Sequence, residues 1–269
     1  NRAAELLSGQ STVYDIIVPT SMAITAPDDI VKSLNTSNQQ DAINYMNSLL
    51  SPSVVKVPVF DELKARRNEY IYFRTDHHWT SLGAYYAYSK WATVKGIAPT
   101  SLDAFKKHEF SGFLGSFYTS SKKMPQLKAN PDTVFAYEPL ETNTIRICSV
   151  KSGWYYSKII TDMSASSAGS KYLSFIKGDN PLSYITNPNI TDGSSCLVIK
   201  ESFGNAFVPF LVGHYGTVFV VDYRYFADVD KRGLAQYCKE LNIKDVIFIN
   251  NISATRNPGL VNKIDALVR

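Results

Sequence analysis

The 269-residue sequence contains few cysteines and no long apolar run. Its 3 cysteines are widely spaced and form neither a Cys-x-x-Cys pair nor a Cys/His metal-binding pattern. Cys196 and Cys238 lie in apolar patterns, so we expect them to fill the core. No stretch predicts a membrane span, and no charged leader followed by an apolar stretch predicts a signal peptide. These features leave the cellular compartment open.

A strong excess of one charge is also missing. Lys and Arg together number 28 and Asp and Glu 24, which gives a net charge of +4. The basic residues are scattered, apart from short pairs such as Arg66-Arg67 and Lys106-Lys107. Nucleic-acid-binding proteins normally gather such residues into a patch or stripe. We therefore expect no nucleic acid among the partners.

Apolar residues make up 45% of the chain, which suits one large domain over residues 1–269. The expected strands cover residues 14–19, 54–59, 69–73, 195–200, 217–222 and 245–250. The expected helices cover residues 28–34, 39–50, 61–67, 80–96, 205–215, 231–242 and 258–268, with Thr80 or Ser81 as N-cap of the fourth. Apolar strands separated by helices predict a parallel sheet covered on both faces, an α/β fold.

Residues from about 105 to 190 differ in composition from the rest of the chain. Short aromatic or β-branched segments alternate there with Gly, Ser, Pro and Asn, which predicts a β-rich insertion. The segments are residues 112–121, 133–140, 144–150 and 155–163. The Ser-rich stretch 164–170 is expected to form a loop.

The stretch RTDHHWT at residues 74–80 holds half of the 4 histidines in the chain. In an extended loop, residues two apart point the same way, so Asp76 and His78 can face one site while His77 faces away. A carboxylate that holds one ring nitrogen of a histidine leaves the other nitrogen free to act as a base. A structural role at the start of the following helix explains the cluster about equally well. A metal site needs three or four ligands, and His108 and His214 lie in unrelated contexts, so we expect no metal.

Polar residues follow three of the expected strands, where a parallel sheet normally places its functional groups. Ser202 follows the strand at 195–200, and a serine at such a junction can act as a nucleophile or as an N-cap. Arg224, in the segment beginning Asp222-Tyr223, can bind an anion or pair with a nearby aspartate. Asn250 or Asn251, after the third strand, can donate an amide N–H to an oxyanion or simply form a turn. The segment 178–180, Gly-Asp-Asn, is most economically a turn.

These segments together resemble a known family. RTDHHWT followed by a Gly/Tyr-rich helix, with VIKESFGNAFVPFL, VVDYRYF and DVIFINN later, is similar to the DHHW family of Gram-positive bacteria. That family resembles the SGNH-like acetyltransferases that modify alginate and cell-wall polysaccharides. The resemblance covers most of the chain, and it implies a flavodoxin-like, circularly permuted SGNH fold with the β-rich insertion.

Carried onto this sequence, the resemblance implies a triad of Ser202 as nucleophile, His78 as general base and Asp76 as its orienter. Asn250 or Asn251 would be the amide donor, and the loop with Tyr223 and Arg224 would supply further oxyanion or acyl contacts. The sequence departs from the family pattern at the serine, where the usual Gly-Asp-Ser is Lys200-Glu201-Ser202.

The implied function is O-acetyl transfer to an extracellular or cell-surface polysaccharide through an acyl-enzyme, without a cofactor. Related systems receive acetyl groups from a membrane-bound O-acyltransferase, so the resemblance implies such a partner, and it is compatible with a membrane anchor in the full-length protein. Two alternatives stay open. Water as acceptor would make the protein an esterase or deacetylase, and loss of the serine geometry would make it a non-catalytic polysaccharide-binding or assembly module.

Overall fold

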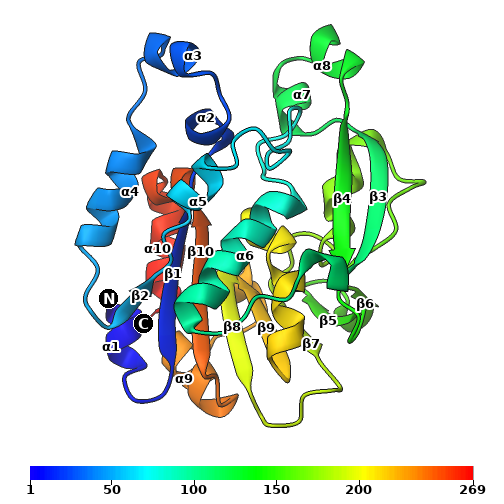
Figure 1. The fold of residues 1–269 in the computed structure, drawn as a ribbon. Coiled ribbons are helices and arrows are strands. Elements are labelled where there is room, and N and C mark those ends of the chain that lie inside the picture. The colour runs from blue at the N-terminus through cyan, green and yellow to red at the C-terminus, as the bar shows by residue number, and fades with distance from the viewer. Residues whose placement is uncertain (269) are drawn as a thin grey trace.

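The computed structural model describes residues 1–268, which fold around a sheet of eight strands (Figure 1). The strands of this sheet are β1 (Thr12–Val18), β2 (Val54–Lys56), β5 (Thr144–Ser149), β6 (Gly153–Lys158), β7 (Leu182–Thr186), β8 (Ser195–Lys200), β9 (Thr217–Asp222) and β10 (Asp245–Asn251). Their spatial order is β2-β1-β10-β8-β9-β7-β5-β6. Every residue of β8 and β10 is buried, because both strands lie in the middle of the sheet with a covered face on each side.

The sheet is mixed rather than purely parallel. Strands β2, β1, β10, β8 and β9 are parallel, and β7, β5 and β6 then add to the edge in antiparallel pairs. The predictions of parallel strands flanked by helices and of a β-rich insertion are confirmed. The sheet is mixed because strands of the insertion join its edge: β5 and β6 pair as a hairpin, and β7 pairs with β5 and β9.

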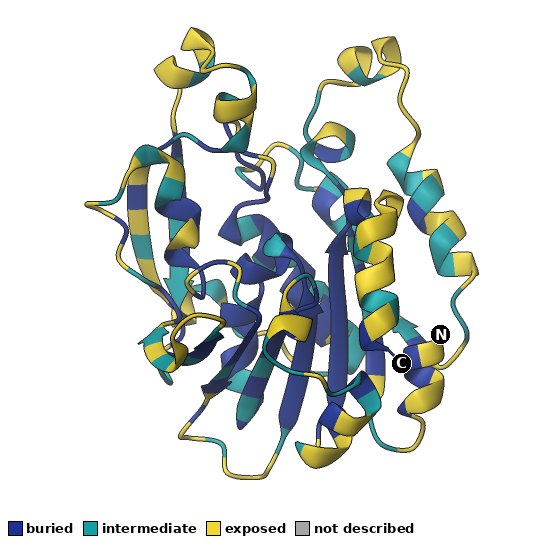
Figure 2. Ribbon diagram, turned by 180° about the vertical axis from the view of Figure 1, so that it is seen from behind, coloured by how far each residue is buried: buried dark blue, intermediate teal, exposed yellow. Residues whose placement is uncertain are grey.

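Helices cover both faces of the sheet. Outside the middle region the helices are α1 (Arg2–Leu6), α2 (Ser21–Ile24), α3 (Asp28–Ser33), α4 (Gln39–Ser48), α5 (Phe60–Lys64), α6 (Ser81–Lys95), α9 (Leu234–Glu240) and α10 (Pro258–Leu267), of which α2 and α3 lie beyond the ends of the strands in Figure 1. Figure 1 shows α6 in front of the sheet and α9 and α10 behind it, and Figure 2 shows the buried strands between these layers. Helix α6 begins after the N-cap Thr80 and ends at Gly96, whose φ of 81° favours glycine. Within the described part of the chain, no helix combines the length and the apolar character that crossing a bilayer requires.

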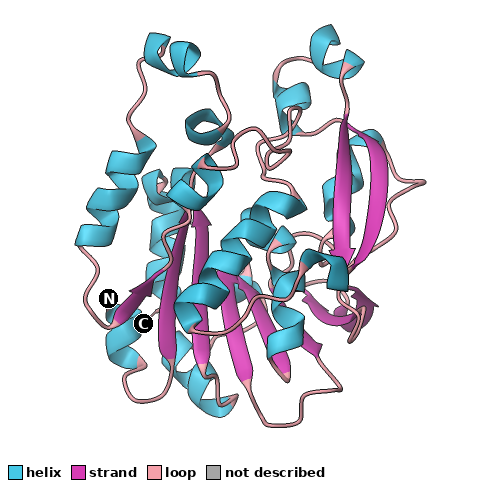
Figure 3. Cartoon of the chain, in the orientation of Figure 1, coloured by secondary structure: helices cyan, strands magenta, loops and turns pink. Residues whose placement is uncertain are grey.

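The middle region divides between two sheets. Strands β3 (Lys106–Phe113) and β4 (Asp132–Glu138) form a separate antiparallel pair, which stands apart from the main sheet in Figure 3. The short helices α7 (Ser116–Ser120) and α8 (Pro125–Ala129) connect these two strands. Of the segment 112–121, only the first two residues lie in a strand, which ends at Phe113, and helix α7 begins at Ser116.

Two other expected elements differ from the structure. Residues 69–73 form no strand and make only an isolated bridge between Tyr72 and Trp79, because the chain turns back on itself around the histidine motif. The expected helix at 205–215 is replaced by the 3₁₀ segments η3 (Ser202–Ala206) and η4 (Val208–His214). Pro209 lies in the first turn of η4 and has no N–H to donate to a continuous α-helix.

Candidate active site

The turn after β8 carries Ser202 and is held by the side chain before it. Both carboxylate oxygens of Glu201 accept backbone N–H bonds, one from Phe203 at 3.3 Å and the other from Asn251 at 3.0 Å. A Cβ at Gly204 would lie 2.5 Å from Cβ of Lys200, so the turn requires glycine there. Glu201 thus holds the serine turn against the end of β10, although the usual preceding glycine is replaced by lysine.

The histidine loop is anchored from two directions. Asp132, fully buried at the start of β4, accepts hydrogen bonds from both N–H and Oγ1 of Thr75, each at 2.6 Å. On the other side, Nε1 of Trp79 donates to the carbonyl of Phe203 at 2.9 Å. The tryptophan of the motif therefore ties the histidine loop directly to the serine turn.

Asp76, His78 and Ser202 form one hydrogen-bonded series. Oδ1 of Asp76 lies 2.6 Å from Nδ1 of His78 and also accepts the His78 backbone N–H at 2.9 Å. Nε2 of His78 lies 2.7 Å from Oγ of Ser202. Asp76 and His78 are buried and Ser202 is partly exposed, so the series ends at solvent.

A neighbouring loop completes the surroundings of Asp76. Its Oδ2 accepts the backbone N–H of Ser116 at 2.8 Å. A Cβ at Gly115 would lie only 2.2 Å from that oxygen, so the loop can approach Asp76 this closely only with glycine at position 115. Burial alone would raise the pKa of Asp76, but the hydrogen bond and charge of His78, with the Ser116 N–H, hold this pKa well below its usual value. Asp76 is consequently ionised and able to stabilise a protonated His78.

Tyr172 covers one face of His78 and had no signal in the sequence. The two rings are stacked with centroids 4.0 Å apart and an angle of 11° between their planes. The hydroxyl of Tyr172 donates to the carbonyl of Ser202 at 3.0 Å. Tyr172 comes from the 3₁₀ segment η2 (Ala168–Ser174), which begins inside the stretch expected to be a loop.

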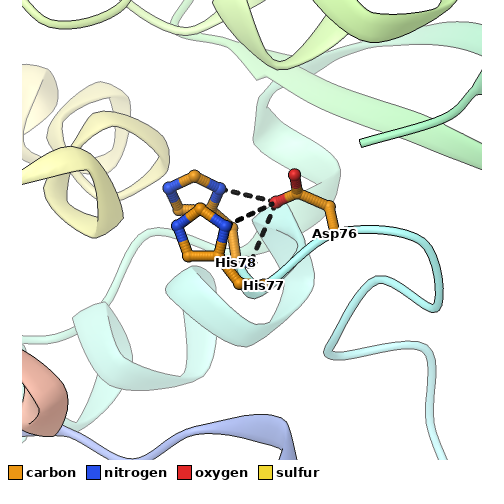
Figure 4. Close-up of side chains that lie close together, drawn as sticks. All are labelled: Asp76, His77 and His78. Atoms are coloured by element: carbon orange, nitrogen blue, oxygen red, sulfur yellow. Dashed lines mark hydrogen bonds and ion pairs between the residues drawn. The ribbon is translucent and has the colours of Figure 1, made fainter. Parts of the chain in front are cut away.

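The two histidines of the motif have separate partners. His77 places Nδ1 2.6 Å from Oγ of Ser116, and that same oxygen accepts the His77 backbone N–H at 3.1 Å. Figure 4 shows the two imidazole rings next to each other, each with one nitrogen turned toward Asp76 and the other turned away. Their centroids are 3.8 Å apart.

Asp76, His77 and His78 also offer potential metal-ligand atoms within 4.8 Å of one another. The contact of 2.6 Å between Oδ1 of Asp76 and Nδ1 of His78 is a hydrogen-bond distance. Zinc sits about 2.0–2.2 Å from each ligand atom, so an ion between these two atoms would require them to move apart. The arrangement as it stands suits proton sharing better than metal ligation.

The other residues singled out from the sequence have different positions. Arg224 lines the pocket that contains Ser202, where its guanidinium bonds Asp222 at 2.6 Å and Asp179 at 2.8 Å. Tyr223 is buried in the core on the α9 face of the sheet. Asn250 and Asn251 line two other pockets, and the Asn251 side chain accepts the backbone N–H of Ser253. Of the four, the structure brings only Arg224 to the serine pocket.

Asp179 was not recognised from the sequence as a residue of the serine pocket. Asp179, interpreted there as part of a turn, lines the pocket and bonds both Arg224 and the fully buried Lys200. Burial would raise the pKa of Asp179, but the charges of these two cations lower it to about 2. Asn205 donates Nδ2 to Asp179 at 2.9 Å, and it lines the same pocket. The pocket has a volume of about 640 Å³.

Comparisons with known proteins agree with this fold. The family model for DHHW proteins matches residues 1–221. A DHHW family protein from Eubacterium siraeum aligns over 97% of this chain and 86% of its own, with 29% identity and a TM-score of 0.86. Bacillus cereus PatB1 aligns over 96% of this chain and 88% of its own, with 21% identity and a TM-score of 0.77. A second structure of PatB1, with a sulfonyl adduct, aligns over 96% and 86% with 19% identity and a TM-score of 0.76.

None of the curated proteins matched the sequence. The match to the family model covers most of the chain and includes the histidine motif and the serine turn. The chain belongs to the DHHW family.

Proposed function

We propose that the protein is a serine O-acyltransferase, specifically an O-acetyltransferase that modifies a polysaccharide outside the cell. The observation that carries this proposal is the series from Asp76 through His78 to Ser202, with contacts of 2.6 and 2.7 Å. A nucleophile, a base and an orienting carboxylate in this order are what acyl transfer through serine requires.

In the first step, Oγ of Ser202 attacks the carbonyl carbon of an acyl donor while its proton moves to Nε2 of His78. The tetrahedral intermediate collapses, the donor's leaving group takes the proton from His78, and the acyl group remains on Ser202. An acceptor hydroxyl then gives its proton to His78 and attacks the acyl carbon, and Ser202 recovers its proton. Asp76 stays ionised throughout and stabilises the protonated imidazole.

The oxyanion formed in both steps needs donors beside Ser202. The N–H of Phe203 is bonded to Glu201, whereas Ser202 begins η3, where N–H groups have no acceptor within the helix. We assign the backbone N–H of Ser202 and the side-chain amide of Asn205 to this role. Asn205 replaces Asn250 and Asn251 in our proposal because it lines the serine pocket.

The acceptor and donor follow from the family resemblance and from the site. A sugar hydroxyl is the proposed acceptor, and the acyl group is proposed to come from a membrane-bound O-acyltransferase at the surface of a Gram-positive bacterium. No cofactor takes part in the proposed steps. Tyr223 has no direct role, whereas Arg224 is proposed to hold the pocket open through Asp179 and Asp222.

Mass spectrometry after exposure to an activated acetyl ester tests this function. We expect one added acetyl group on a peptide containing Ser202, and none on the Ser202→Ala or His78→Ala variants. The PatB1 structure with a sulfonyl adduct suggests a second reagent, because sulfonyl fluorides react with activated serines. Identical labelling of wild type and Ser202→Ala would exclude the proposal. Measuring acetate release beside transfer to an oligosaccharide separates the transferase from an esterase.

A further inference from the structure

His77 stands between two pockets. One is the pocket of about 640 Å³ that contains Ser202, and the other, of about 670 Å³, is lined by Tyr70, Arg74 and Phe117. Among the described residues that line these two pockets, His77 alone lines both. Its side chain is 46% exposed, in contrast to the buried His78. A molecule long enough to occupy both pockets would have to pass over His77.

The contacts of His77 suggest which ring nitrogen is offered to such a molecule. The Ser116 hydroxyl accepts the His77 backbone N–H, and we assign its own proton to the contact with Nδ1, which makes Nδ1 the acceptor. Burial and the nearby charge of His78 lower the pKa of His77 to about 4, so the ring is neutral near pH 7. A neutral ring that accepts at Nδ1 carries its proton on Nε2. That N–H belongs to the nitrogen turned away from Asp76 (Figure 4).

The two imidazoles therefore present different groups side by side. Nε2 of His78 faces Ser202, and Nε2 of His77 carries a proton, with the ring centroids 3.8 Å apart. Neighbouring hydroxyls on a sugar ring are close enough together for one to reach each imidazole. One hydroxyl would lose its proton to His78, and its neighbour would accept a hydrogen bond from His77.

We propose, on the basis of the acyl transfer proposed above, that His77 binds the acceptor sugar through the hydroxyl adjacent to the one that is acylated. His77 is then an acceptor-binding residue, and it takes no proton during the reaction. It selects acceptors with two adjacent hydroxyls over acceptors that carry a single one. Ser116 is a positioning residue that keeps Nε2–H of His77 directed at the sugar.

The second pocket has the composition expected for further sugars of the same acceptor chain. Its lining combines aromatic rings with groups that form hydrogen bonds, and it includes Tyr70, Phe117, Arg74, Glu69 and Ser253. Phe117 and Arg74 are exposed, at 39% of the residue and 56% of the side chain respectively. A sugar ring has apolar faces and a polar rim, so it can contact both kinds of group at once.

Transfer to defined sugars tests the role of His77. The acyl-enzyme is formed with an activated acetyl ester, and methyl glucopyranoside or one of its monodeoxy derivatives is added as acceptor. For the wild type we expect kcat/KM for transfer to fall about 5- to 10-fold when the hydroxyl beside the acylated position is missing, the effect of one hydrogen bond. In His77→Leu the two acceptors should react equally, whereas His77→Asn, which keeps a donor, should recover part of the preference.

Acyl-enzyme formation and spontaneous hydrolysis are measured with the same proteins, so that the preference between the two acceptors is compared as a ratio within each variant. His108→Leu, whose imidazole bonds Glu138 on the β3–β4 pair, is the matched histidine control and should keep the wild-type preference. If the His77→Leu acyl-enzyme still prefers the acceptor with two adjacent hydroxyls as strongly as wild type does, the role of His77 is excluded and the proposed function remains. Failure of the wild type to acylate Ser202 would instead overturn the proposed function together with it.

Discussion

Asp76 supplies the negative charge that lies against the imidazole of His78. Its Oδ1 accepts both the ring N–H and the backbone N–H of His78, so it fixes the position as well as the tautomer of the imidazole. Removing its charge while keeping its shape separates these two effects.

We expect Asp76→Asn to fold normally and to lower the turnover of an activated acetyl ester by about 10³- to 10⁴-fold, as in other serine triads whose carboxylate becomes an amide. The amide can present its N–H to Nδ1, which reverses the tautomer that His78 needs. A burst of acylation measured by rapid mixing checks this expectation. If the acylation rate of Asp76→Asn stays within about tenfold of the wild-type rate, Asp76 has no part in the mechanism.

Asn205 is the second residue whose role can be isolated. Its Oδ1 is buried without a hydrogen-bond partner among the described residues, while Nδ2 bonds Asp179 and faces the serine pocket. We expect Asn205→Ala to lower kcat about 10²- to 10³-fold, the usual effect of removing one oxyanion donor. Asn250→Ala is the matched control, because Asn250 lines a different pocket. Equal losses in the two variants would mean that Asn205 acts through the fold instead.

At the scale of elements, the ends of β8 and β9 are joined by a buried ion network. Lys200 is fully buried and bonds the fully buried Asp222 at 2.9 Å and Asp179 at 3.3 Å. Arg224 bonds the same two aspartates from the loop after β9. Lys200 therefore links the serine turn to the neighbouring strand.

We expect Lys200→Met to lower the free energy of unfolding by about 3–5 kcal/mol, because a buried carboxylate would lose one of its partners. Chemical denaturation measures this loss. Lys244→Met, at an exposed lysine bonded to Asn242, should change stability by less than about 0.5 kcal/mol. A Lys200→Met protein as stable as wild type would show that Arg224 alone neutralises both aspartates.

For the whole molecule, the lowered pKa values near the site make stability depend on pH. His77 has its pKa lowered to about 4 and Asp179 to about 2, so the unfolded chain binds protons at a pH where the folded chain does not. As the pH falls from the unfolded pKa of each group toward its folded pKa, the free energy of unfolding falls, because the unfolded chain takes up the proton first.

Urea denaturation of wild type and of the His77→Gln variant between pH 7 and pH 4 isolates the contribution of His77. The free energy of unfolding of the wild type should fall relative to that of the variant as the pH falls from about 6.5 toward 4. A variant whose pH dependence coincides with that of wild type would contradict the lowered pKa of His77.

Several features could be predicted because they depend on residues close together in the chain. The apolar runs of β1, β8, β9 and β10 predicted strands, and the residues between them predicted the covering helices. The pairing of Asp76 with His78 was predicted from the motif, but the expectation that His77 faces away is wrong. Residues 74–78 bend instead of extending, so Nδ1 of His77 also lies 3.8 Å from Oδ1 of Asp76. The family membership was likewise predicted from local motifs.

Other features were decided only by tertiary structure. Ser202 lies 124 positions from His78 in the sequence, and their contact depends on Trp79, Asp132 and Glu201 holding two loops together. Tyr172 and Asn205 carry no local signal, and Asn250 and Asn251 face other pockets although they end the expected strand. The sequence predicted the β-rich insertion but not that β5, β6 and β7 would extend the main sheet. Local patterns report only which residues are apolar and how they alternate, whereas the partner across a pocket is chosen by the packing of the whole chain.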